Sequence, residues 1–454
     1  MRMAQSLDTI AAIATPTGSS ALAIIRVSGP EALPLAKLFL DENPKPRFAT
    51  YHDYKDKTGV TVDDVVFTFY PEKNSATGEH VLEISCHGNP YITQRILSDL
   101  LERECRLAEP GEFTRRSFLN GKIDLSQAEA VMDIISARSE RALAAANRQL
   151  RGGLARHMKP LVDELVMAIA TVEAYIDFPE EDLPQEDKQR IKNYISAVLE
   201  GSVQLLATQR YGDLLRDGMR TVIVGEPNAG KSSLLNRLIG KDRAIVSPQA
   251  GTTRDFLEER IIVGPHCLRL VDTAGLNINP DPIEKLGIDK TIECIESSDI
   301  ILFVIDATKP APKIDSRIIN YISKDTTLVV YNKTDLLETA LPAPAINKDI
   351  SSVLVSAHTG KGIDSLKAWI VAKADSMQPA SQEDAVFINA RHAHALSQAQ
   401  SCLRDALNKL TTNSPTELLA SDLRGALSAL GEISGHIDNE QILDRLFASF
   451  CIGK

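Results

Sequence analysis

The sequence predicts a multidomain protein of mixed α/β and α class. A small N-terminal α+β domain comes first, and a P-loop α/β domain is then inserted into a discontinuous helical domain. Three observations support this fold class. The 454 residues exceed what one hydrophobic core serves, since domains usually hold about 100 to 200 residues. The hydrophobic pattern changes three times along the chain, and a glycine-rich phosphate-loop motif stands near its middle.

The N-terminal domain is expected over residues 1–121. Short apolar runs rich in β-branched residues alternate there with Gly, Pro and Asn, which is typical of strands separated by turns. Strands are predicted at Ile10–Ala14, Ala21–Val27, Val65–Tyr70 and Val81–Ser85, and helices at Glu31–Leu40 and Tyr91–Glu104. A small α+β fold follows from this mixture.

The first part of the helical domain is expected over residues 122–217. The stretch from about Asp124 to Tyr175 is rich in Ala, Leu, Glu and Arg and predicts a long helix. A break at Phe178–Pro184 precedes a second helical stretch from Gln185 to about Leu215. No strand pattern interrupts this region.

Strand and helix then alternate over residues 218–378, which predicts a parallel sheet wrapped by helices. Strands are predicted at Thr221–Gly225, Leu268–Asp272, Ile300–Asp306, Thr327–Asn332 and Val353–Ser356, and helices at Lys231–Ile239, Ile283–Ser297 and Ile363–Ala372.

Residues 379–454 return to helix, after a linker at Gln378–Asp384. Helices are predicted at Ala390–Leu410, Thr416–Leu430 and Gln441–Phe450. Because their apolar stripes need a partner, we expect these helices to pack on the helices of Asp124–Leu215, as the second part of one domain. Two independent bundles are the alternative.

Composition narrows the class of protein. With 43% hydrophobic and 24% charged residues, the chain is globular rather than disordered. The net charge of −11 argues against non-specific coating of nucleic acid, although a local basic patch is still able to dock on phosphates. The six cysteines are scattered with no CxxC pair and no His-rich companion, so neither a zinc site nor a disulfide framework is suggested, and we expect reduced thiols. No leader pattern and no run of 18 apolar residues occurs, so we expect a cytoplasmic protein.

Residues Gly225–Ser232 fit the pattern GxxxxGK[ST] between a predicted strand and a predicted helix. Backbone N–H groups of such a loop cradle phosphates at the helix N-terminus. Lys231 is expected at the terminal phosphates, and the Ser232 hydroxyl on Mg²⁺. A chance glycine-rich loop is the alternative, which the strand–loop–helix context disfavours.

Three further motifs follow predicted strands. Asp272–Gly275 reads DTAG, where the aspartate holds the metal through water and the Gly275 N–H meets the γ-phosphate. Asn332–Asp335 reads NKTD, whose carboxylate accepts from two guanine N–H groups that adenine lacks. Ser356–Ala357 resembles a backbone support for the guanine carbonyl. Together these motifs predict GTP as the ligand.

Two switch segments carry the remaining candidates. Gly251–Asp255 holds Thr252 and Thr253, either of which suits a metal, and a plain polar turn is the alternative. Leu276 stands where a water-orienting glutamine often sits, so another group must prepare the attacking water. Glu284, nine residues past Gly275 in the second switch, is the nearest plausible carboxylate for this role, unless it is only a solvated first-turn glutamate. Arg254 or a bound cation would offset transition-state charge.

Six segments then resemble one family over nearly the whole chain. They are Asp8–Pro16, Ile25–Gly29, Pro110–Thr114, Asp124–Ala130, Gly225–Ser233 and the terminal Phe450–Lys454. These residues resemble the MnmE (TrmE) family of tRNA-modification GTPases, and the Cys-Ile-Gly-Lys ending is the most specific of them.

The resemblance implies a homodimer built through tetrahydrofolate-binding N-terminal domains, with a Ras-like GTPase domain inserted in the helical domain. It implies a potassium-dependent GTP hydrolase that works with the flavoprotein MnmG (GidA), which carries FAD and uses NADH. The complex would use 5-formyl- or 5,10-methylene-tetrahydrofolate to place an aminomethyl or carboxymethylaminomethyl group on C5 of the wobble uridine of tRNA.

The same resemblance assigns residues to roles. Glu284 would orient the water, with Lys231 and Cys451 as further catalytic candidates, and Mg²⁺ would be held by Ser232 and Thr253. Potassium would be held by Asn228, Ser247, Gln249 and Thr252, and folate by Arg26, Glu83, Lys122 and Lys454. The full set of GTP-binding candidates is Asn228, Ala229, Gly230, Lys231, Ser232, Ser233, Ser247, Pro248, Gln249, Ala250, Gly251, Thr252, Thr253, Asp272, Thr273, Ala274, Gly275, Asn332, Lys333, Asp335, Ser356 and Ala357.

Some alternatives remain open. A regulatory or ribosome-assembly GTPase switch would need neither folate nor a terminal cysteine. The N-terminal domain would then serve dimerisation alone, with Arg26 and Glu83 as a structural ion pair. Cys451 is either a nucleophile or a buried small residue. Arginines spread over one side of a predicted helix contact tRNA phosphates or form a solvated face: Arg138, Arg141, Arg148, Arg151 and Arg156.

Overall fold

The computed structural model describes the chain in the following residue ranges: 8–177, 185–240, 258–272, 292–310, 312, 316–337, 349–378, 386–412, 414–435, 446–447 and 450–453. The backbone divides into two compact units. Unit 1 comprises residues 1–132, 149–188 and 401–454, and unit 2 comprises residues 133–148 and 189–400. Residues of the predicted helical domain therefore belong to both units.

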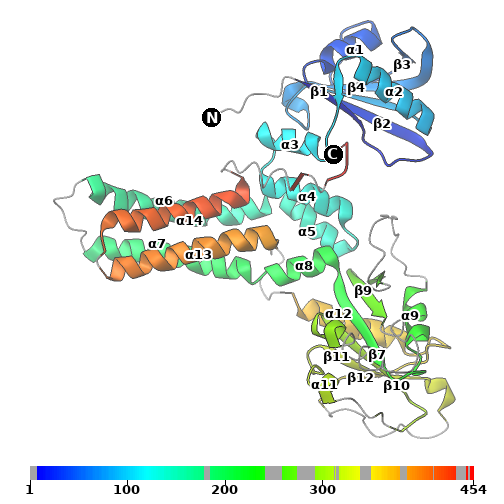
Figure 1. Cartoon of the computed structure of the whole chain (residues 1–454), viewed down its shortest axis with the longest axis vertical. Coiled ribbons are helices and arrows are strands. Elements are labelled where there is room, and N and C mark those ends of the chain that lie inside the picture. Colours follow the sequence, from blue (N-terminus) through cyan, green and yellow to red (C-terminus); the bar gives the residue numbers. More distant parts are fainter. Residues whose placement is uncertain are drawn as a thin grey trace, which may run out of the picture. The chain divides into compact units, whose positions relative to one another are not determined.

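Unit 1 contains a six-stranded sheet in the order β3-β4-β5-β2-β1-β6 (Figure 1). Its strands are β1 (Thr9–Ile13), β2 (Ser20–Ser28), β3 (Ala49–Lys55), β4 (Thr61–Tyr70), β5 (Val81–Gly88) and β6 (Cys105–Leu107). All pairs are antiparallel except β1 with β6. The four strands predicted from the sequence are confirmed to within a few residues.

Helices α1 (Ala32–Leu40) and α2 (Pro90–Glu102) cover one face of this sheet. Their apolar stripes pack on alternate residues of the strands, and Tyr54 and Phe67 are among the largest fully buried side chains. At β1 the other face packs against α3 (Glu112–Leu119) through Phe113, which joins Ile10 and Ala12. A short 3₁₀ turn, Glu72–Asn74, precedes β5.

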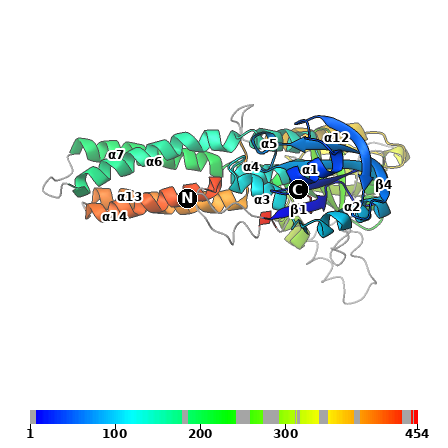
Figure 2. The same cartoon turned by 90° about the horizontal axis from the view of Figure 1, so that it is seen from above.

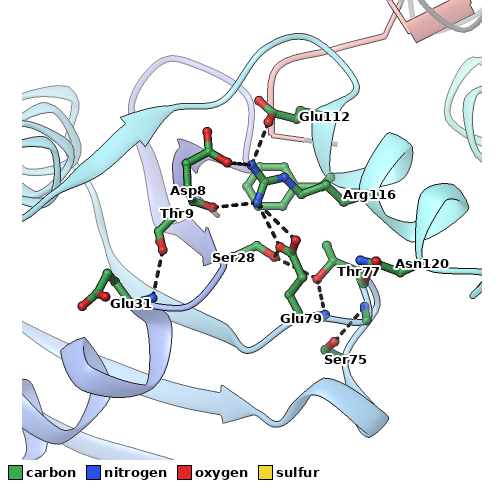
Figure 3. Close-up of polar contacts among 12 residues, drawn as sticks. Asp8, Thr9, Ser28, Glu31, Ser75, Thr77, Glu79, Glu112, Arg116 and Asn120 are labelled. Carbon is green, nitrogen blue, oxygen red and sulfur yellow. Dashed lines mark hydrogen bonds and ion pairs between the residues drawn. The ribbon is translucent and has the colours of Figure 1, made fainter. Parts of the chain in front are cut away.

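A buried arginine ties α3 to the sheet (Figure 3). The Arg116 side chain is 4% exposed and donates to Asp8, Glu79 and Glu112 at 2.8 to 3.1 Å. Removing a guanidinium from water is costly unless carboxylates surround it, and here three do. The cluster fixes the start of β1, the loop before β5 and α3 in one arrangement.

The helical part of unit 1 includes α6 (Gly153–Asp177) and α14 (Thr416–Ser434), far apart in sequence. The two run side by side in both views (Figures 1 and 2), and Arg424 of α14 donates to Glu173 of α6 at 2.7 Å. Helix α14, from the second part of the predicted helical domain, therefore packs on α6, from the first part. This arrangement agrees with one discontinuous helical domain.

The long helix expected over Asp124–Tyr175 is wrong in detail, because the structure breaks it into α4 (Leu125–Ser136), α5 (Glu140–Leu150) and α6. The Ser139 hydroxyl caps α5 by accepting from the Ala142 N–H, and Gly152 adopts a left-handed φ of 77° before α6. Local capping chemistry thus overrides the helical composition. The five arginines between Arg138 and Arg156 consequently do not share one helix.

Unit 2 contains the second sheet, in the order β12-β11-β10-β7-β9-β8. Its strands are β7 (Met219–Gly225), β8 (Glu258–Val263), β9 (His266–Asp272), β10 (Ile300–Asp306), β11 (Thr327–Asn332) and β12 (Ser352–Leu354). All neighbours are parallel except β8 with β9. Among the described residues, the sheet is accompanied by helices α9 (Lys231–Ile239), α11 (Ser316–Ile319) and α12 (Ile363–Ser376) and by a 3₁₀ turn at Thr334–Leu336. The predicted parallel α/β domain is confirmed.

Helical segments outside the α/β domain also contribute to unit 2. They are most of α5, most of α7 (Gln185–Leu206), α8 (Gln209–Asp217) and the first half of α13 (Ala390–Thr411). Arg141 of α5 reaches the α/β domain, where it pairs with Asp375 at 2.7 Å, and Asp375 also accepts from His266 at 2.9 Å. We call Arg141, Asp375 and His266 the α5 joint.

Several elements escaped prediction for identifiable reasons. Strand β3 is a polar edge strand, β6 has three residues, and β8 reads as charged at its start. Helix α3 has only eight residues, and its apolar residues Phe113, Phe118 and Leu119 stand at its two ends around a polar centre. The predicted helices at Ile283–Ser297 and Gln441–Phe450 lie mostly outside the described residues.

Candidate functional site

The predicted nucleotide motifs follow the carboxyl ends of parallel strands in unit 2. After β7 the chain first adds β8 and β9 on one side of β7, and then adds β10, β11 and β12 on the other side. The strand order therefore reverses at β7. Ligands of open α/β sheets bind at this kind of reversal, outside the carboxyl ends of the strands. The loop after β7 is residues 225–230, the phosphate loop predicted from the sequence.

Backbone conformation explains the residue types of this loop. Gly225 and Gly230 have φ values of 152° and 91°, and Asn228 is left-handed at 62°. A Cβ on Gly225 would lie 2.1 Å from the Val304 carbonyl oxygen, so only glycine allows β7 and β10 to come this close. The loop is therefore shaped by its glycines to bring backbone N–H groups to the start of α9.

Lys231 begins α9 and is 8% exposed. Its ammonium donates to the carbonyls of Gly225 and Glu226, at 2.8 and 3.0 Å, and so lies across the loop that would hold phosphates. Ser232 and Ser233 follow on the first turn and are exposed. A cation and two hydroxyls at a helix N-terminus suit an anion with a bound divalent metal.

Asn332, at the end of β11, connects three loops. It is 2% exposed, donates through Nδ2 to the Ala229 carbonyl at 3.0 Å, and accepts at Oδ1 from the Ala357 N–H at 3.0 Å. Both polar atoms of the amide are satisfied inside the protein. Asn332 thus fixes the phosphate loop against the loop after β12.

Lys333 is held by a residue that the sequence motifs do not include. Its ammonium lies 2.7 Å from a carboxylate oxygen of Asp306, the last residue of β10. The other carboxylate oxygen accepts from the Thr308 hydroxyl and N–H, at 2.6 and 3.0 Å. Burial raises the pKa of Asp306, but these hydrogen bonds outweigh it and leave the pKa below its usual value.

Asp335 and Ser356 form the other side of the expected base site. The Ser356 hydroxyl hydrogen-bonds Asp335 and lowers the pKa of its carboxyl, which keeps the carboxylate ionised near neutral pH. Ser356 itself is fully buried and caps the next turn by accepting from the Thr359 N–H at 3.0 Å. An ionised, solvent-facing carboxylate is what two guanine N–H donors require.

The structure brings together nine candidates around one edge of the sheet: Asn228, Ala229, Gly230, Lys231, Ser232, Ser233, Asn332, Ser356 and Ala357. Lys333 and Asp335 extend this edge. Asp272 ends β9 beside Ile223, although nothing is described of its side chain. The candidates in 247–253 and 273–275, together with Glu284, lie outside the described residues.

A second group of candidates lies on the sheet of unit 1. Arg26 of β2 and Glu83 of β5 are directly opposite in the antiparallel register and form an ion pair at 2.8 Å. Tyr70 of β4 donates to the other Glu83 oxygen at 3.4 Å, and the Arg26 guanidinium lies 5.7 Å from the centre of the Phe113 ring. Both charged side chains remain about one quarter exposed, so a ligand is able to reach them.

The C-terminal tail, residues 450–453, docks beside this pair. The Gly453 carbonyl accepts from Arg26 at 3.3 Å, and the Cys451 carbonyl accepts from the Gly111 N–H at 3.3 Å. Phe450 is buried against Phe447. The Cys451 side chain is exposed, so its interpretation as a buried small residue is wrong.

Lys122, a third folate candidate, lies apart from this pair. Lys122 donates to the Lys73 carbonyl at 2.9 Å, a contact that involves neither Arg26 nor Glu83. Lys454 follows Gly453 but lies outside the described residues. Of the three folate candidates that the structure describes, Arg26 and Glu83 are brought together and Lys122 is not.

Sequence reasoning missed three residues that complete these two groups. Asp306 and Thr308 fix Lys333, and Tyr70 contacts Glu83. A signal for Asp306 existed, since a lone carboxylate ends a strand whose other six residues are all apolar and buried. Tyr70 offered none, because its pairing with Glu83 depends on the register between β4 and β5.

Comparison with known proteins bears directly on these groups. A family model described as the MnmE helical domain matches residues 125–451, and one described as the GTP-binding protein TrmE N-terminus matches residues 9–122. Within the described residues, no helix is both long and apolar enough to span a membrane. The two family matches together take in nearly the entire chain.

Curated relatives agree with the family models. The tRNA modification GTPase MnmE of Opitutus terrae is 52% identical over 447 residues, covering 98% of this chain and 99% of that protein. The proteins of the same name from Aquifex aeolicus and Coxiella burnetii are 42% and 40% identical, each covering 98% of this chain. They are themselves covered over 100% and 99% of their lengths.

Solved structures give a partial likeness. Era of Aquifex aeolicus aligns with 40% of this chain and 66% of its own, at 27% identity and a TM-score of 0.27. The family assignment does not depend on this overlap. From the two family models and the full-length relatives, we conclude that the chain belongs to the MnmE family of tRNA modification GTPases and is a GTP-hydrolysing enzyme.

Proposed function

We propose that this GTPase is potassium-dependent and works with a flavoprotein partner, MnmG (GidA), on C5 of the wobble uridine of certain tRNAs. The group added is aminomethyl or carboxymethylaminomethyl, and its one-carbon unit comes from a tetrahydrofolate derivative. The observation that carries the proposal is that one chain builds two groups of functional residues. A guanine-nucleotide edge lies in unit 2, and a charged pair that meets the chain's own terminus lies in unit 1.

The GTP-binding candidates at the carboxyl edge of the unit 2 sheet support the part of the proposal that concerns GTP hydrolysis. Lys231 and the N–H groups of the loop would bind the phosphates, and Ser232 would hold Mg²⁺ together with Thr253. The exposed, left-handed Asn228 presents an amide oxygen on the same loop, which suits a potassium ligand. A monovalent cation there would offset charge that develops between the β- and γ-phosphates.

The test of the hydrolytic half is GTP turnover in potassium and in sodium at equal ionic strength. We expect strong potassium stimulation that Glu284→Ala abolishes, because that carboxylate would orient the attacking water. Glu293→Ala removes an exposed carboxylate from helical residues that lie C-terminal to Glu284 in the sequence. It is the matched control and should keep full turnover. Turnover indifferent to the cation and to Glu284→Ala would overturn the mechanism.

The Arg26–Glu83 pair supports the folate half. A carboxylate accepts two parallel N–H donors of a pterin. Among the described residues, the second Glu83 oxygen accepts a single long bond, from Tyr70 at 3.4 Å, which such donors would replace. Arg26 and the tail lysine, Lys454, suit an anionic glutamyl group. The residues present therefore fit a reduced folate.

Folate binding is tested by titrating the full chain with 5-formyl-tetrahydrofolate. Glu83→Gln keeps the shape but removes the charge, and should weaken binding by on the order of tenfold or more, as expected for a hydrogen-bonded carboxylate. Ser85→Ala, two residues along the same strand and on the same face, is the matched control and should bind normally. A wild-type chain that does not bind folate would favour the regulatory switch, with Arg26 and Glu83 as a structural pair.

Cys451 and the dimer require their own measurements. Cys451→Ser should leave GTP hydrolysis and folate binding intact but stop one-carbon transfer if the thiol is a nucleophile, and unchanged transfer would exclude that role. The homodimer is proposed to form through the N-terminal domains, and equilibrium sedimentation of the chain tests it. A monomer at micromolar concentration would contradict the proposal.

A further inference from the structure

We propose that Asp306 is a positioning residue of the guanine-nucleotide site. It acts through Lys333, whose ammonium it holds in one place so that the aliphatic stem of the lysine forms a fixed edge of the base site. This inference depends on the GTPase activity, and not on the proposed potassium or folate chemistry.

The geometry of the pair is specific. The Lys333 Nζ and the Asp306 Oδ2 are 2.7 Å apart, the distance of a charge-assisted hydrogen bond. Asp306 is 6% exposed, whereas the lysine side chain is 30% exposed. The carboxylate is thus the fixed partner, and the lysine lies between it and solvent.

The surroundings of Asp306 serve this single contact. Its Oδ1 is already occupied by the Thr308 hydroxyl and N–H, at 2.6 and 3.0 Å, which leaves Oδ2 for Lys333. The Ala307 N–H donates to the Asn332 carbonyl at 2.9 Å, and this bond fixes the end of β10 to the end of β11. Asp306 is thereby oriented by two neighbours and has little freedom to release the lysine.

The backbone of Lys333 adds a second constraint. Lys333 is left-handed, with a φ of 64°, directly after Asn332, whose side chain is bonded to the phosphate loop and to Ala357. Because the Lys333 backbone and its ammonium group are both fixed, the four methylene groups between them have little conformational freedom. Lysine stems commonly lie against apolar surface while the charge is held elsewhere, and the flat face of a purine is such a surface.

A residue with this role should affect ground-state and transition-state binding equally, because the base does not change during phosphate hydrolysis. Asp306→Asn should therefore raise the Kd of fluorescent GDP, and the KM for GTP, by about tenfold, the lower range for a bond to a charged group. The kcat should remain within about twofold of wild type, as for loss of uniform binding.

A double-mutant cycle separates positioning from simple structural support. If Asp306 acts through Lys333, then Asp306→Asn should have almost no further effect on GDP affinity in a Lys333→Met chain, since the shared contact is already lost. Asp306→Glu, which keeps the charge, should recover part of the affinity. Thr308→Val, which removes one bond to Asp306 but no charge, should cost less than Asp306→Asn.

Thermal unfolding without nucleotide measures any purely structural contribution of each variant. Equal losses of GDP affinity from Asp306→Asn in the wild-type and Lys333→Met chains would overturn the proposal. Unchanged affinity in a folded Asp306→Asn chain would overturn it too. A fall in kcat with unchanged KM would also contradict it, because that pattern belongs to a group that acts only in the transition state.

Discussion

Single residues in this protein are placed by backbone conformations that few side chains tolerate. The phosphate loop depends on Gly225 and Gly230, which adopt positive φ values and leave no room for a Cβ beside the Val304 carbonyl and the Asn332 side chain. In unit 1, Arg116 depends instead on charge, since three carboxylates replace the water it loses on burial. Both cases explain a residue type by what surrounds it.

Gly230→Ala should disable nucleotide binding. The new Cβ would lie 2.2 Å from the Asn332 Nδ2, and Asn332 cannot move aside because both ends of its amide are bonded. We expect GDP affinity to fall by more than about tenfold, which corresponds to roughly 1.4 kcal/mol. Gly59→Ala is the matched control, since its φ of 83° is similar to that of Gly230 but no atom lies within 4 Å of the new Cβ. An equal loss in both variants would show that the clash is unimportant.

Acid should weaken unit 1 through Glu112. Burial raises the pKa of Glu112, but bonds from Arg106, the Glu109 N–H and Arg116 outweigh it, so the folded pKa lies below the usual value. A depressed carboxyl pKa contributes stability that is fully present above the unfolded pKa, near 4.3, and is lost as pH falls through the folded pKa. Urea unfolding from pH 7 to pH 3 should show this loss.

Two substitutions test this origin of the acid dependence, one at Glu112 and one at a control position. Glu112→Gln should flatten the loss of stability below about pH 4.3, because the titrating group is gone. Glu42→Gln, at an exposed position, should leave the acid limb unchanged. If Glu112→Gln keeps the full acid dependence, another group of unit 1 is responsible for it.

At the scale of elements, polar contacts from α5 hold the α/β domain of unit 2 to a neighbouring helix. The α5 joint connects α5 with the start of β9 and the end of α12 through Asp375. Arg141 also donates through its backbone N–H to the Pro265 carbonyl, in the turn between β8 and β9. An arginine that appeared available for nucleic acid is therefore engaged within its own unit.

Asp375→Ala should destabilise unit 2 more than Arg141→Ala does. Burial lowers the pKa of His266, so its ring is neutral near pH 7, and without Asp375 a buried N–H loses its acceptor at a cost of about 1 to 3 kcal/mol. Arg141 and Asp375 are 32% and 42% exposed, and such an ion pair contributes at most about 1 kcal/mol. Chemical unfolding followed at unit 2 measures both values. Equal costs would mean that the ion pair, rather than the buried histidine, is the main contact.

At the scale of the whole molecule, the chain consists of two units that each have their own core and their own candidate ligand. Unit 1 packs its sheet beneath α1 and α2, whereas unit 2 has apolar clusters on both faces of its parallel sheet. All described GTP-binding candidates belong to unit 2, and the Arg26–Glu83 pair belongs to unit 1. Each ligand should therefore act on the stability of one unit.

GDP should raise the melting temperature of unit 2 and leave that of unit 1 nearly unchanged. A ligand at 100 times its Kd stabilises the state it binds by about 2.7 kcal/mol. Calorimetry of the full chain with and without GDP measures this, and fluorescence from the single tryptophan, Trp369 in α12, identifies the transition of unit 2. Equal shifts of both transitions would mean that the two units unfold together.

Much of this protein follows from sequence alone, because its strongest signals are local. The alternation of strands and helices around residues 218–378, and the glycines of the phosphate loop, depend on side-chain period and on allowed φ values, which neighbours along the chain already specify. Four strands of the first sheet were predicted for the same reason. The family resemblance rests likewise on short motifs.

Tertiary structure decided what depends on partners distant in the chain. The Asp306–Lys333 pair joins two strands across a sheet, Tyr70 meets Glu83 through strand register, and Gly453 reaches Arg26 from 427 residues away. No period or motif records such contacts, because they exist only once packing has brought separate segments together. Sequence determined the kinds of secondary-structure element and the ligand that they suit. Tertiary packing decided which side chains contact one another.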